Sequence, residues 1–252
     1  MLRARLTFCV LLPLTAMLAG CPVFPEQTPA DPQQLREQTT GAEAWIYVPS
    51  YHTSDRAWPL VITLHGSAVW DGAYRQALEW KHLAEEHGFL VAAPELRSAE
   101  GVLPQFGRFD RLREDERKIL AVRREMVRLY NADPDVVLLT GFSAGGYPMY
   151  WTGLRNPGEF DMLVARACNS SADLLENADA PPAARELPIR IFWGKDDLKP
   201  LQDQSWQAFR YLREHGCERT ELKKVAGGHL RRPQTAWHLW QHHMPKRYRK
   251  RH

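Results

Sequence analysis

The stretch VVLLTGFSAGG, residues 136–146, decides the fold. Its first five residues are apolar or β-branched, as in a short buried strand. The chain then runs into Gly-x-Ser-x-Gly, with Ser143 between Gly141 and Gly145, and on into a segment that can be helical. Strand, pentad and helix in that order predict a nucleophile elbow, a tight turn that presents the serine hydroxyl at the end of a strand. Glycine is needed on both sides because the turn leaves no room there for side chains.

The pentad alone is weak evidence, since at average Gly and Ser usage it arises by chance in roughly 8% of chains this long. The strand before it and the helix after it strengthen the prediction. A catalytic serine also needs a base to take its proton, an acid to orient that base, and N–H groups to hold the developing oxyanion. The rest of the chain must therefore supply these groups in a compatible order.

The composition is that of an ordinary globular protein, with 44% hydrophobic and 25% charged residues in a chain of 252. This length suffices for one large α/β domain with a sizeable core. The formal charge is +3, but the positive excess comes from Arg3 and Arg5 and from a basic C-terminal tail, residues 246–252. The body between them is mildly acidic, which argues against nucleic-acid binding. We expect the tail to be solvated, with contact to an anionic surface as the alternative.

The N-terminus has the design of an export signal, predicted over residues 1–20. Two arginines precede a mostly apolar run of residues 6–18 that is too short to span a bilayer comfortably. The sequence LAGC at residues 18–21 resembles the lipobox of bacterial lipoproteins, in which the cysteine is lipidated and becomes the new N-terminus. This resemblance implies an exported protein of the bacterial cell envelope, anchored to a membrane through Cys21. The alternative is a plain signal peptide, or one left uncleaved, with an incidental Cys21.

Residues 21–40 contain four prolines and little to bury, so we predict that they form a tether. Residues 41–245 are predicted to form one catalytic domain, in which short apolar runs alternate with amphipathic segments. Strands are expected near 43–48, 60–64, 89–93, 136–140, 162–167, 189–193 and 221–225, with helices over 73–87, 111–130, 146–154, 201–215 and 234–243. This alternation predicts an α/β fold with a mainly parallel sheet and helices on both faces.

Three further strand ends carry polar candidates, and sites in an open parallel sheet gather at the carboxyl ends of its strands. The three ends read HGS at 65–67, GKDD at 194–197 and AGGH at 226–229. No Cys/His cluster has the spacing of metal ligands, and there is no Gly-rich phosphate loop. We therefore expect neither a metal nor a cofactor.

Together with the elbow, these ends place Ser, Asp and His in the chain order of the α/β-hydrolase fold. The chain resembles α/β-hydrolase serine esterases over about residues 41–243, especially the polyhydroxybutyrate-depolymerase, feruloyl-esterase and dienelactone-hydrolase-like branch. The resemblance implies Ser143 as nucleophile, His229 as base and, from the Gly-x-x-Asp pattern, Asp197 as acid, with Asp196 as the alternative. Dienelactone hydrolases proper use a cysteine nucleophile, so that activity is not expected here.

The His65-Gly66 pair resembles the oxyanion loop of this family. The resemblance implies that the backbone N–H groups of Ala144 and Ser67 hold the oxyanion and that His65 supports the loop. Pro148 departs from the pattern, because an N–H usually serves the helix at this position. Its presence puts the start of that helix in question, but not the elbow.

The expected reaction is hydrolysis of carboxylic esters, small or polymer-linked, through an acyl-enzyme. Residues 169–187 are interrupted by Pro181-Pro182 and are too short for a large cap domain, so short acyl or compact aryl groups are expected. A serine peptidase on the same fold is one alternative, although such enzymes usually carry extra domains. A noncatalytic binding lipoprotein on a hydrolase scaffold is another, although such proteins usually lack one member of the triad.

Cys168 ends an expected buried strand and Cys217 follows an expected helix. In an exported protein the two could form a disulfide. The sequence does not place their Cα atoms, so this pairing stays open.

Overall fold

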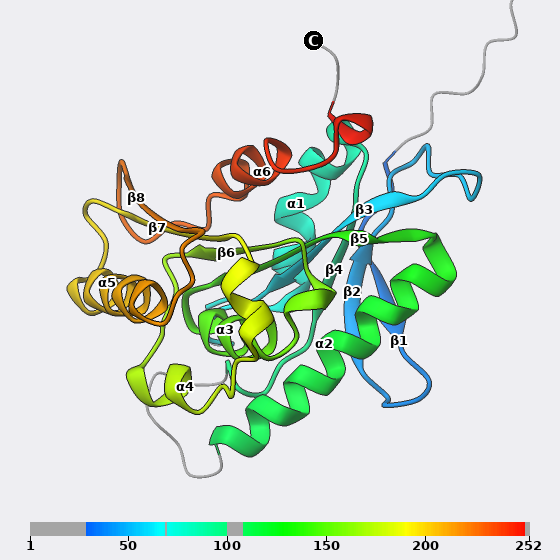
Figure 1. Cartoon of the computed structure of the whole chain (residues 1–252). Coiled ribbons are helices and arrows are strands. Elements are labelled where there is room, and N and C mark those ends of the chain that lie inside the picture. Colours follow the sequence, from blue (N-terminus) through cyan, green and yellow to red (C-terminus); the bar gives the residue numbers. More distant parts are fainter. Residues whose placement is uncertain (1–28, 69, 100–107, 250–252) are drawn as a thin grey trace, which may run out of the picture.

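The computed structural model describes residues 29–68, 70–99 and 108–249 (Figure 1). The predicted signal peptide and Cys21 lie outside these residues. One eight-stranded sheet, in the order β1-β2-β4-β3-β5-β6-β7-β8, runs through the molecule. Its strands are β1 Gln33–Arg36, β2 Glu43–Tyr47, β3 Trp58–Leu64, β4 Leu90–Pro94, β5 Ala132–Phe142, β6 Met162–Arg166, β7 Ile189–Gly194 and β8 Thr220–Val225. β2 is antiparallel to both its neighbours and the remaining pairs are parallel, which confirms the mainly parallel sheet.

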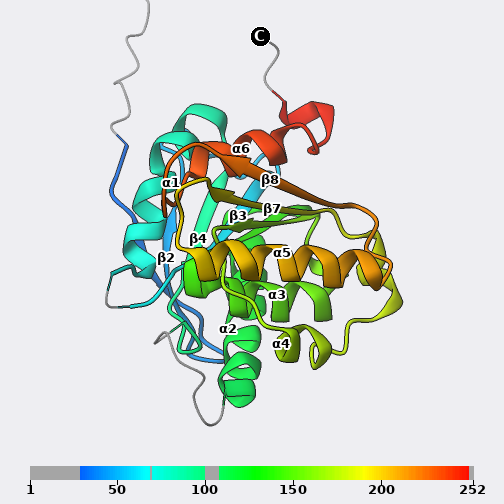
Figure 2. The same ribbon diagram turned by 90° about the vertical axis from the view of Figure 1, so that its left-hand side faces the viewer.

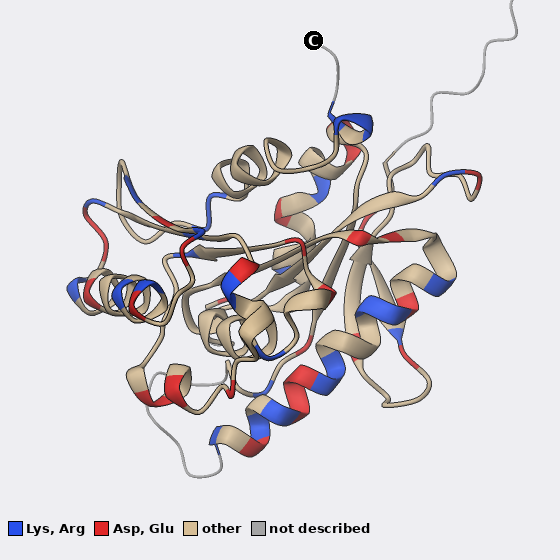
Figure 3. Cartoon of the chain, viewed as in Figure 1, with Lys and Arg blue, Asp and Glu red and all other residues tan. Residues whose placement is uncertain are grey.

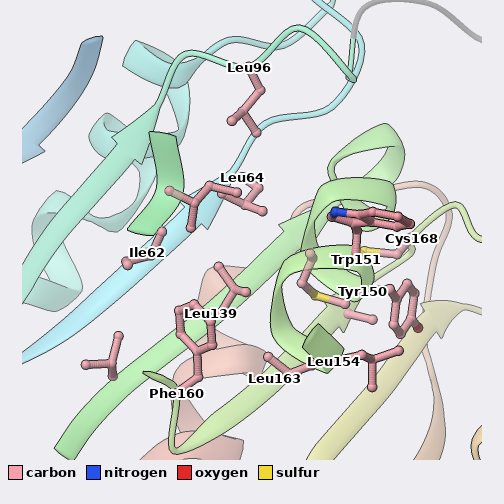
Figure 4. Packing of buried hydrophobic residues seen from close by; sticks show 14 of the residues in the cluster. Ile62, Leu64, Leu96, Leu139, Tyr150, Trp151, Leu154, Phe160, Leu163 and Cys168 are labelled. Atoms are coloured by element: carbon pink, nitrogen blue, oxygen red, sulfur yellow. The ribbon is translucent and has the colours of Figure 1, made fainter. Parts of the chain in front are cut away.

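Helices cover both faces of this sheet (Figures 1 and 2). They are α1 Ala73–His87, α2 Arg108–Tyr130, α3 Gly146–Arg155, α4 Ala172–Glu176, α5 Lys199–Glu214 and α6 Pro233–Gln241. α1 and α6 pack together over one face, whereas α2, α3 and α5 pack against the other. Figure 4 shows the second of these layers, where side chains of α3 such as Trp151 and Leu154 meet those of β5 and β6.

The sheet begins earlier in the chain than predicted. Residues 33–36 form β1, paired antiparallel with β2, and therefore do not belong to a tether. Leu35 is the only apolar residue of β1, and it packs into the core. In the following turn, the Glu37 carboxylate accepts hydrogen bonds from the backbone N–H groups of Thr39 and Thr40. The segment QQLR has no apolar alternation that would indicate a strand. Backbone hydrogen bonds to β2 hold it in the sheet, and these do not depend on the side chains.

Helix α2 covers the predicted range 111–130 and buries one apolar face, with Leu112, Ile119, Val122 and Met126 buried. Leu129, one residue before the end of α2, is 45% exposed because the helix has almost ended there. Figure 3 shows the mixed charges along the solvent side of this helix.

Pro148 does not disturb the helix after the elbow. Ser143–Gly145 form one 3₁₀ turn and α3 begins at Gly146, so Pro148 is the third helical residue. N–H groups in the first turn of a helix have no intrahelical partner, so the N–H that Pro148 lacks is not needed.

Residues 169–187 form α4 and a short 3₁₀ helix, Pro182–Glu186, with no cap domain in this interval. Cys168 and Cys217 are both free and buried. The Cys168 thiol donates to the carbonyl of Gly141 below the elbow, whereas Cys217 lies before β8, at the other end of the sheet. No helix in the described part of the chain is long and apolar enough to cross a membrane.

Candidate active site

The elbow has the geometry that the pentad predicts. Ser143 follows β5 directly and has a φ of +52°, a left-handed conformation that costs energy for a residue with a side chain. A Cβ on Gly141 would lie 2.5 Å from the carbonyl oxygen of Gly145, and one on Gly145 would lie 2.5 Å from that of Leu64. Both contacts are with backbone, so any larger residue would force the turn open.

Gly146 is a third required glycine, which the pentad does not include. A Cβ there would lie 2.4 Å from the carbonyl oxygen of Asn169 and 2.5 Å from the Cβ of Cys168. The close approach lets the Asn169 N–H donate to the Ser143 carbonyl at 2.8 Å. The end of β6 therefore holds the elbow from behind.

The histidine and aspartate loops meet beside the elbow. His229 Nδ1 lies 3.0 Å from Oδ1 of Asp197, whose side chain is fully buried. The same Oδ1 accepts the N–H of Leu198 at 2.7 Å. Asp196 is exposed, and the structure brings it to no side chain of the site. A Cβ on Gly194 would lie 2.0 Å from the Gly227 carbonyl oxygen, so the two loops can approach this closely only with glycine there.

Ser143 and His229 line one cavity of about 450 Å³. The His229 ring stacks on Phe142, with ring centroids 4.7 Å apart and an interplanar angle of 28°. This stacking, together with Asp197, fixes the plane of the imidazole. Neither His229 Nδ1 nor Asp197 Oδ2 has a well-aligned hydrogen-bond partner among the described residues. Catalytic hydrogen bonds are often long or poorly aligned in free enzymes and tighten on binding.

The predicted oxyanion loop lies against the serine. A Cβ on Gly66 would lie 3.2 Å from the Cβ of Ser143, and Ser67 and Ala144 both line the cavity. His65 is buried below the loop, where its Nε2 accepts the N–H of Leu96 at 3.1 Å. Its Nδ1 must then carry the hydrogen and donate to the Gly66 carbonyl at 2.7 Å. His65 thus holds the loop and does not face the cavity.

A cluster of buried charges, which the sequence did not indicate, lies behind the site. Arg166 of β6 is fully buried and ion-pairs with Glu79 of α1 at 2.6 Å. Its guanidinium also donates to the side chains of Thr63, Gln76 and Thr140 and to the carbonyl of Arg231. Burial raises the pKa of Glu79 above its usual range, although Arg166 and Arg231 oppose the shift. The only sequence signal was an arginine at the end of an apolar strand.

Asp71 joins this cluster to the oxyanion loop. Its Oδ2 accepts the N–H of Gly66 at 2.8 Å and that of the Gln76 amide at 2.7 Å. Its Oδ1 lies 3.3 Å from Nε of Arg231, two residues after His229. One carboxylate therefore links the loop beside the serine to the loop that carries the histidine.

The mouth of the cavity is apolar. Trp70, Leu198 and Leu230 are 68%, 62% and 54% exposed, the highest values among large hydrophobic side chains in the described chain. All three line this cavity. Large apolar side chains that gather at one exposed place commonly mark a binding surface. Within the described ranges, no group of three or more His, Cys, Asp or Glu could hold a metal ion.

Fold and site together define the α/β-hydrolase class, with a serine elbow, a histidine loop and an acidic loop at the carboxyl ends of the strands. The chain belongs to the Putative esterase family, which matches residues 39–214.

Several curated proteins are similar to parts of this chain. Acetylxylan esterase A of Aspergillus oryzae is 26% identical over 58% of this chain and 48% of its own length. Dipeptidyl-peptidase 5 of Porphyromonas endodontalis is 25% identical over 81% of this chain and 35% of its own length. A bifunctional acetylxylan esterase/xylanase of Neocallimastix patriciarum is 31% identical over 46% of this chain and 16% of its own length. The chain thus spans less than half the length of each of these relatives.

Solved structures confirm the predicted α/β-hydrolase fold. S-formylglutathione hydrolase from Staphylococcus aureus superposes with a TM-score of 0.62 at 15% identity, covering 84% of this chain and 97% of the other. A ferulic acid esterase superposes with a TM-score of 0.59 at 17% identity, covering 83% and 94%. At these identities the likeness shows the fold alone.

Proposed function

We propose that this protein hydrolyses carboxylic esters through an acyl-enzyme on Ser143. The observation that carries the proposal is the convergence of Ser143 and His229 on one cavity, with His229 Nδ1 3.0 Å from the buried carboxylate of Asp197. A serine hydroxyl is a poor nucleophile at neutral pH and needs such a base. The family match and the acetylxylan esterase relatives support ester chemistry.

In the proposed reaction, His229 Nε2 takes the proton from Ser143 Oγ as this oxygen attacks the ester carbonyl carbon. The N–H groups of Ala144 and Ser67 hold the negative charge that develops on the carbonyl oxygen. Asp197 stabilises the imidazolium that forms. His229 then gives its proton to the departing alcohol, and a water molecule, activated by the same histidine, releases the acid from Ser143.

A serine peptidase is the second candidate, because Dipeptidyl-peptidase 5 is among the relatives. This chain aligns with only 35% of that protein. The family match and the acetylxylan esterase relatives favour esters instead. We therefore favour esters, and we expect short acyl or compact aryl groups because residues 169–187 build no enclosing cap.

The test compares wild type with Ser143→Ala on p-nitrophenyl and hydroxycinnamoyl esters and on dipeptidyl p-nitroanilides. The substitution should lower ester turnover by about 10³-fold or more, because the covalent route is lost while the fold and the oxyanion donors remain. A fluorophosphonate probe should label wild type only. Labelling of the Ser143→Ala protein would place the nucleophile on another serine, and faster cleavage of the anilides would favour the peptidase.

We also propose that Cys21 carries a lipid that anchors the protein to a membrane of the bacterial envelope. The supporting observation is the sequence LAGC after an apolar run. Several acyl chains together hold a protein far more firmly than one chain does, at about 0.8 kcal/mol per buried CH₂. Labelled palmitate should enter wild type but not Cys21→Ser. An unlabelled wild type, recovered without detergent from the expressing bacterium, would contradict the anchor.

A further inference from the structure

Among the described residues that line the cavity, one half-buried cationic side chain is not used in the proposed reaction. Arg231 lines the cavity two residues after His229, and its side chain is 32% exposed. Its guanidinium carbon lies 5.7 Å from the centre of the Phe142 ring, which itself stacks on His229. A guanidinium therefore lies in the cavity, next to the ring that stacks on His229.

The inner nitrogen of the guanidinium, Nε, forms ion pairs but has no well-aligned hydrogen bond among the described residues. Nε of Arg231 lies 3.3 Å from Oδ1 of Asp71 and 3.7 Å from Oε2 of Glu79. Among the described residues, the two terminal nitrogens have no hydrogen-bond partner. These nitrogens form the planar fork that binds a carboxylate through two parallel hydrogen bonds. The protein thus orients the arginine by one side and leaves the binding side open.

The nearby carboxylates do not occupy that open side. Asp71 and Glu79 are 3% and 15% exposed, against 32% for Arg231, so the cluster presents mainly its guanidinium to the cavity. Asp71 Oδ2 is already bonded to Gly66 and Gln76, and Glu79 to Arg166. Arg231 and Arg166 balance the charges of Asp71 and Glu79, so a substrate carboxylate would bind at the outward edge of the Arg231 guanidinium without displacing either of these carboxylates.

The side chains around Arg231 indicate what the rest of the ligand should be. Trp70, Leu198 and Leu230 give the mouth of the cavity an apolar surface. A ligand that matches both features is an ester with an apolar body and a carboxylate close to the ester carbonyl.

We infer that Arg231 is a specificity residue that binds a carboxylate carried by the substrate, so that the preferred substrates are acidic esters. The inference rests on the proposed ester hydrolysis. Hydrogen bonds to charged groups contribute about 1.5–3 kcal/mol, which corresponds to roughly 10- to 100-fold in kcat/KM.

The experiment measures kcat/KM for matched pairs in which a carboxylate replaces a neutral group of similar size. One pair carries the carboxylate on the acyl side, mono-p-nitrophenyl glutarate against p-nitrophenyl pentanoate. The other carries it on the leaving group, 4-acetoxybenzoate against 4-acetoxybenzamide. Rates are corrected for spontaneous hydrolysis. The quantity compared is the ratio of anionic to neutral kcat/KM within each protein, because a change in the position of the loops affects both members of a pair alike.

For at least one pair, this ratio should fall about tenfold or more in Arg231→Gln and less in Arg231→Lys, which keeps the charge. Lys195→Gln is the matched control, because Lys195 is exposed at the same edge of the sheet and does not line the cavity. Its ratio should equal that of wild type. Equal ratios in wild type and Arg231→Gln would overturn the inference and leave Arg231 as a support for Asp71 alone.

Wild type alone gives a second test if Arg231→Gln does not fold. In at least one pair the anionic ester should be the better substrate, and a preference for the neutral ester in both pairs would overturn the inference. Failure of the proposed function looks different. A folded wild type that hydrolyses none of the four esters and takes no fluorophosphonate label would refute the esterase and the acidic-ester preference together.

Discussion

Two neighbouring aspartates in one loop allow a sharp test of the proposed triad. The side chain of Asp197 is fully buried, with Oδ1 3.0 Å from His229 Nδ1, whereas Asp196 is exposed. Each can be changed to asparagine, which keeps the shape of the side chain and removes its charge. The two substitutions change the net charge equally, so Asp196→Asn is a control for Asp197→Asn.

The expected size of the effect follows from the geometry. When His229 accepts the serine proton it becomes an imidazolium, whose positive charge lies about 3 Å from the carboxylate of Asp197. At an effective dielectric constant near 20, two unit charges at this separation attract by about 5 kcal/mol, equivalent to roughly 10⁴-fold in rate. Asparagine cannot supply this attraction and also favours the wrong imidazole tautomer. Asp196→Asn should change kcat/KM by less than about threefold, because an exposed charge without direct contact is largely screened.

The assay is kcat/KM for p-nitrophenyl acetate with wild type and both variants, and circular dichroism and thermal melting show that each is folded. The triad is supported by a loss of about 10³- to 10⁴-fold for Asp197→Asn with a small change for Asp196→Asn. The reverse order would move the acid to Asp196. Equal small losses in two folded variants would refute the role of this loop in catalysis.

Three further predictions concern the elbow, the cavity and the core. Gly146→Ala would place a Cβ 2.4 Å from the Asn169 carbonyl oxygen, so it should lower the melting temperature by several degrees and ester turnover by tenfold or more. Gly158→Ala is the control and should change neither quantity, because a Cβ there would have no atom within 4 Å. In p-nitrophenyl esters from acetate to palmitate, kcat/KM should rise by up to about fourfold per CH₂ over the first few carbons and then level off, because the cleft is open. A steady rise through the long acyl chains would contradict this, since it would require an enclosed tunnel. Burial raises the pKa of Asp161 from 3.8 to about 7. Between these two values the folded protein keeps a proton that the unfolded chain releases. The contribution of this proton to stability is complete below about pH 4 and is lost as the pH rises through 7. Urea unfolding at pH 5 to 8 should therefore show Asp161→Asn gaining on wild type by roughly 2 to 3 kcal/mol, and a constant difference across that range would contradict the assignment.

Much of the fold was predictable because its signals are local. Apolar runs with turn residues at their ends marked the strands from Trp58 onwards, and amphipathic spacing marked the helices. The elbow was predictable because the steric demand on Gly141 and Gly145 is written in the pentad itself. β1 was missed because Gln33–Arg36 is held by backbone pairing with β2, which leaves no pattern in its side chains.

The candidate site was predictable at the residues that directly follow strands, since parallel strands bring their carboxyl ends together. Ser143, Asp197, His229 and the loop at Gly66 are of this kind. The choice between Asp196 and Asp197 needed the structure, because burial on one side of a loop depends on how β7 and β8 pair. Arg231 and Asp71 gave no signal, because a charged residue in a loop is indistinguishable from solvated surface until its partner, 160 residues away in the chain, is placed beside it.

Arg166 explains how loops so distant in sequence keep a common geometry. Burying a guanidinium is unfavourable unless its donors are satisfied, and here five acceptors satisfy them: Glu79, Thr63, Gln76, Thr140 and the carbonyl of Arg231. These acceptors come from α1, β3, β5 and the loop after β8, so moving any one of these elements would leave a buried charge with an unpaired donor. Asp71 and Arg231 extend the cluster from this fixed point to the backbone of Gly66 beside Ser143. The loops of the proposed site are therefore held from below by polar contacts. Substrate choice is left to the side chains above them: the apolar mouth and the open edge of Arg231.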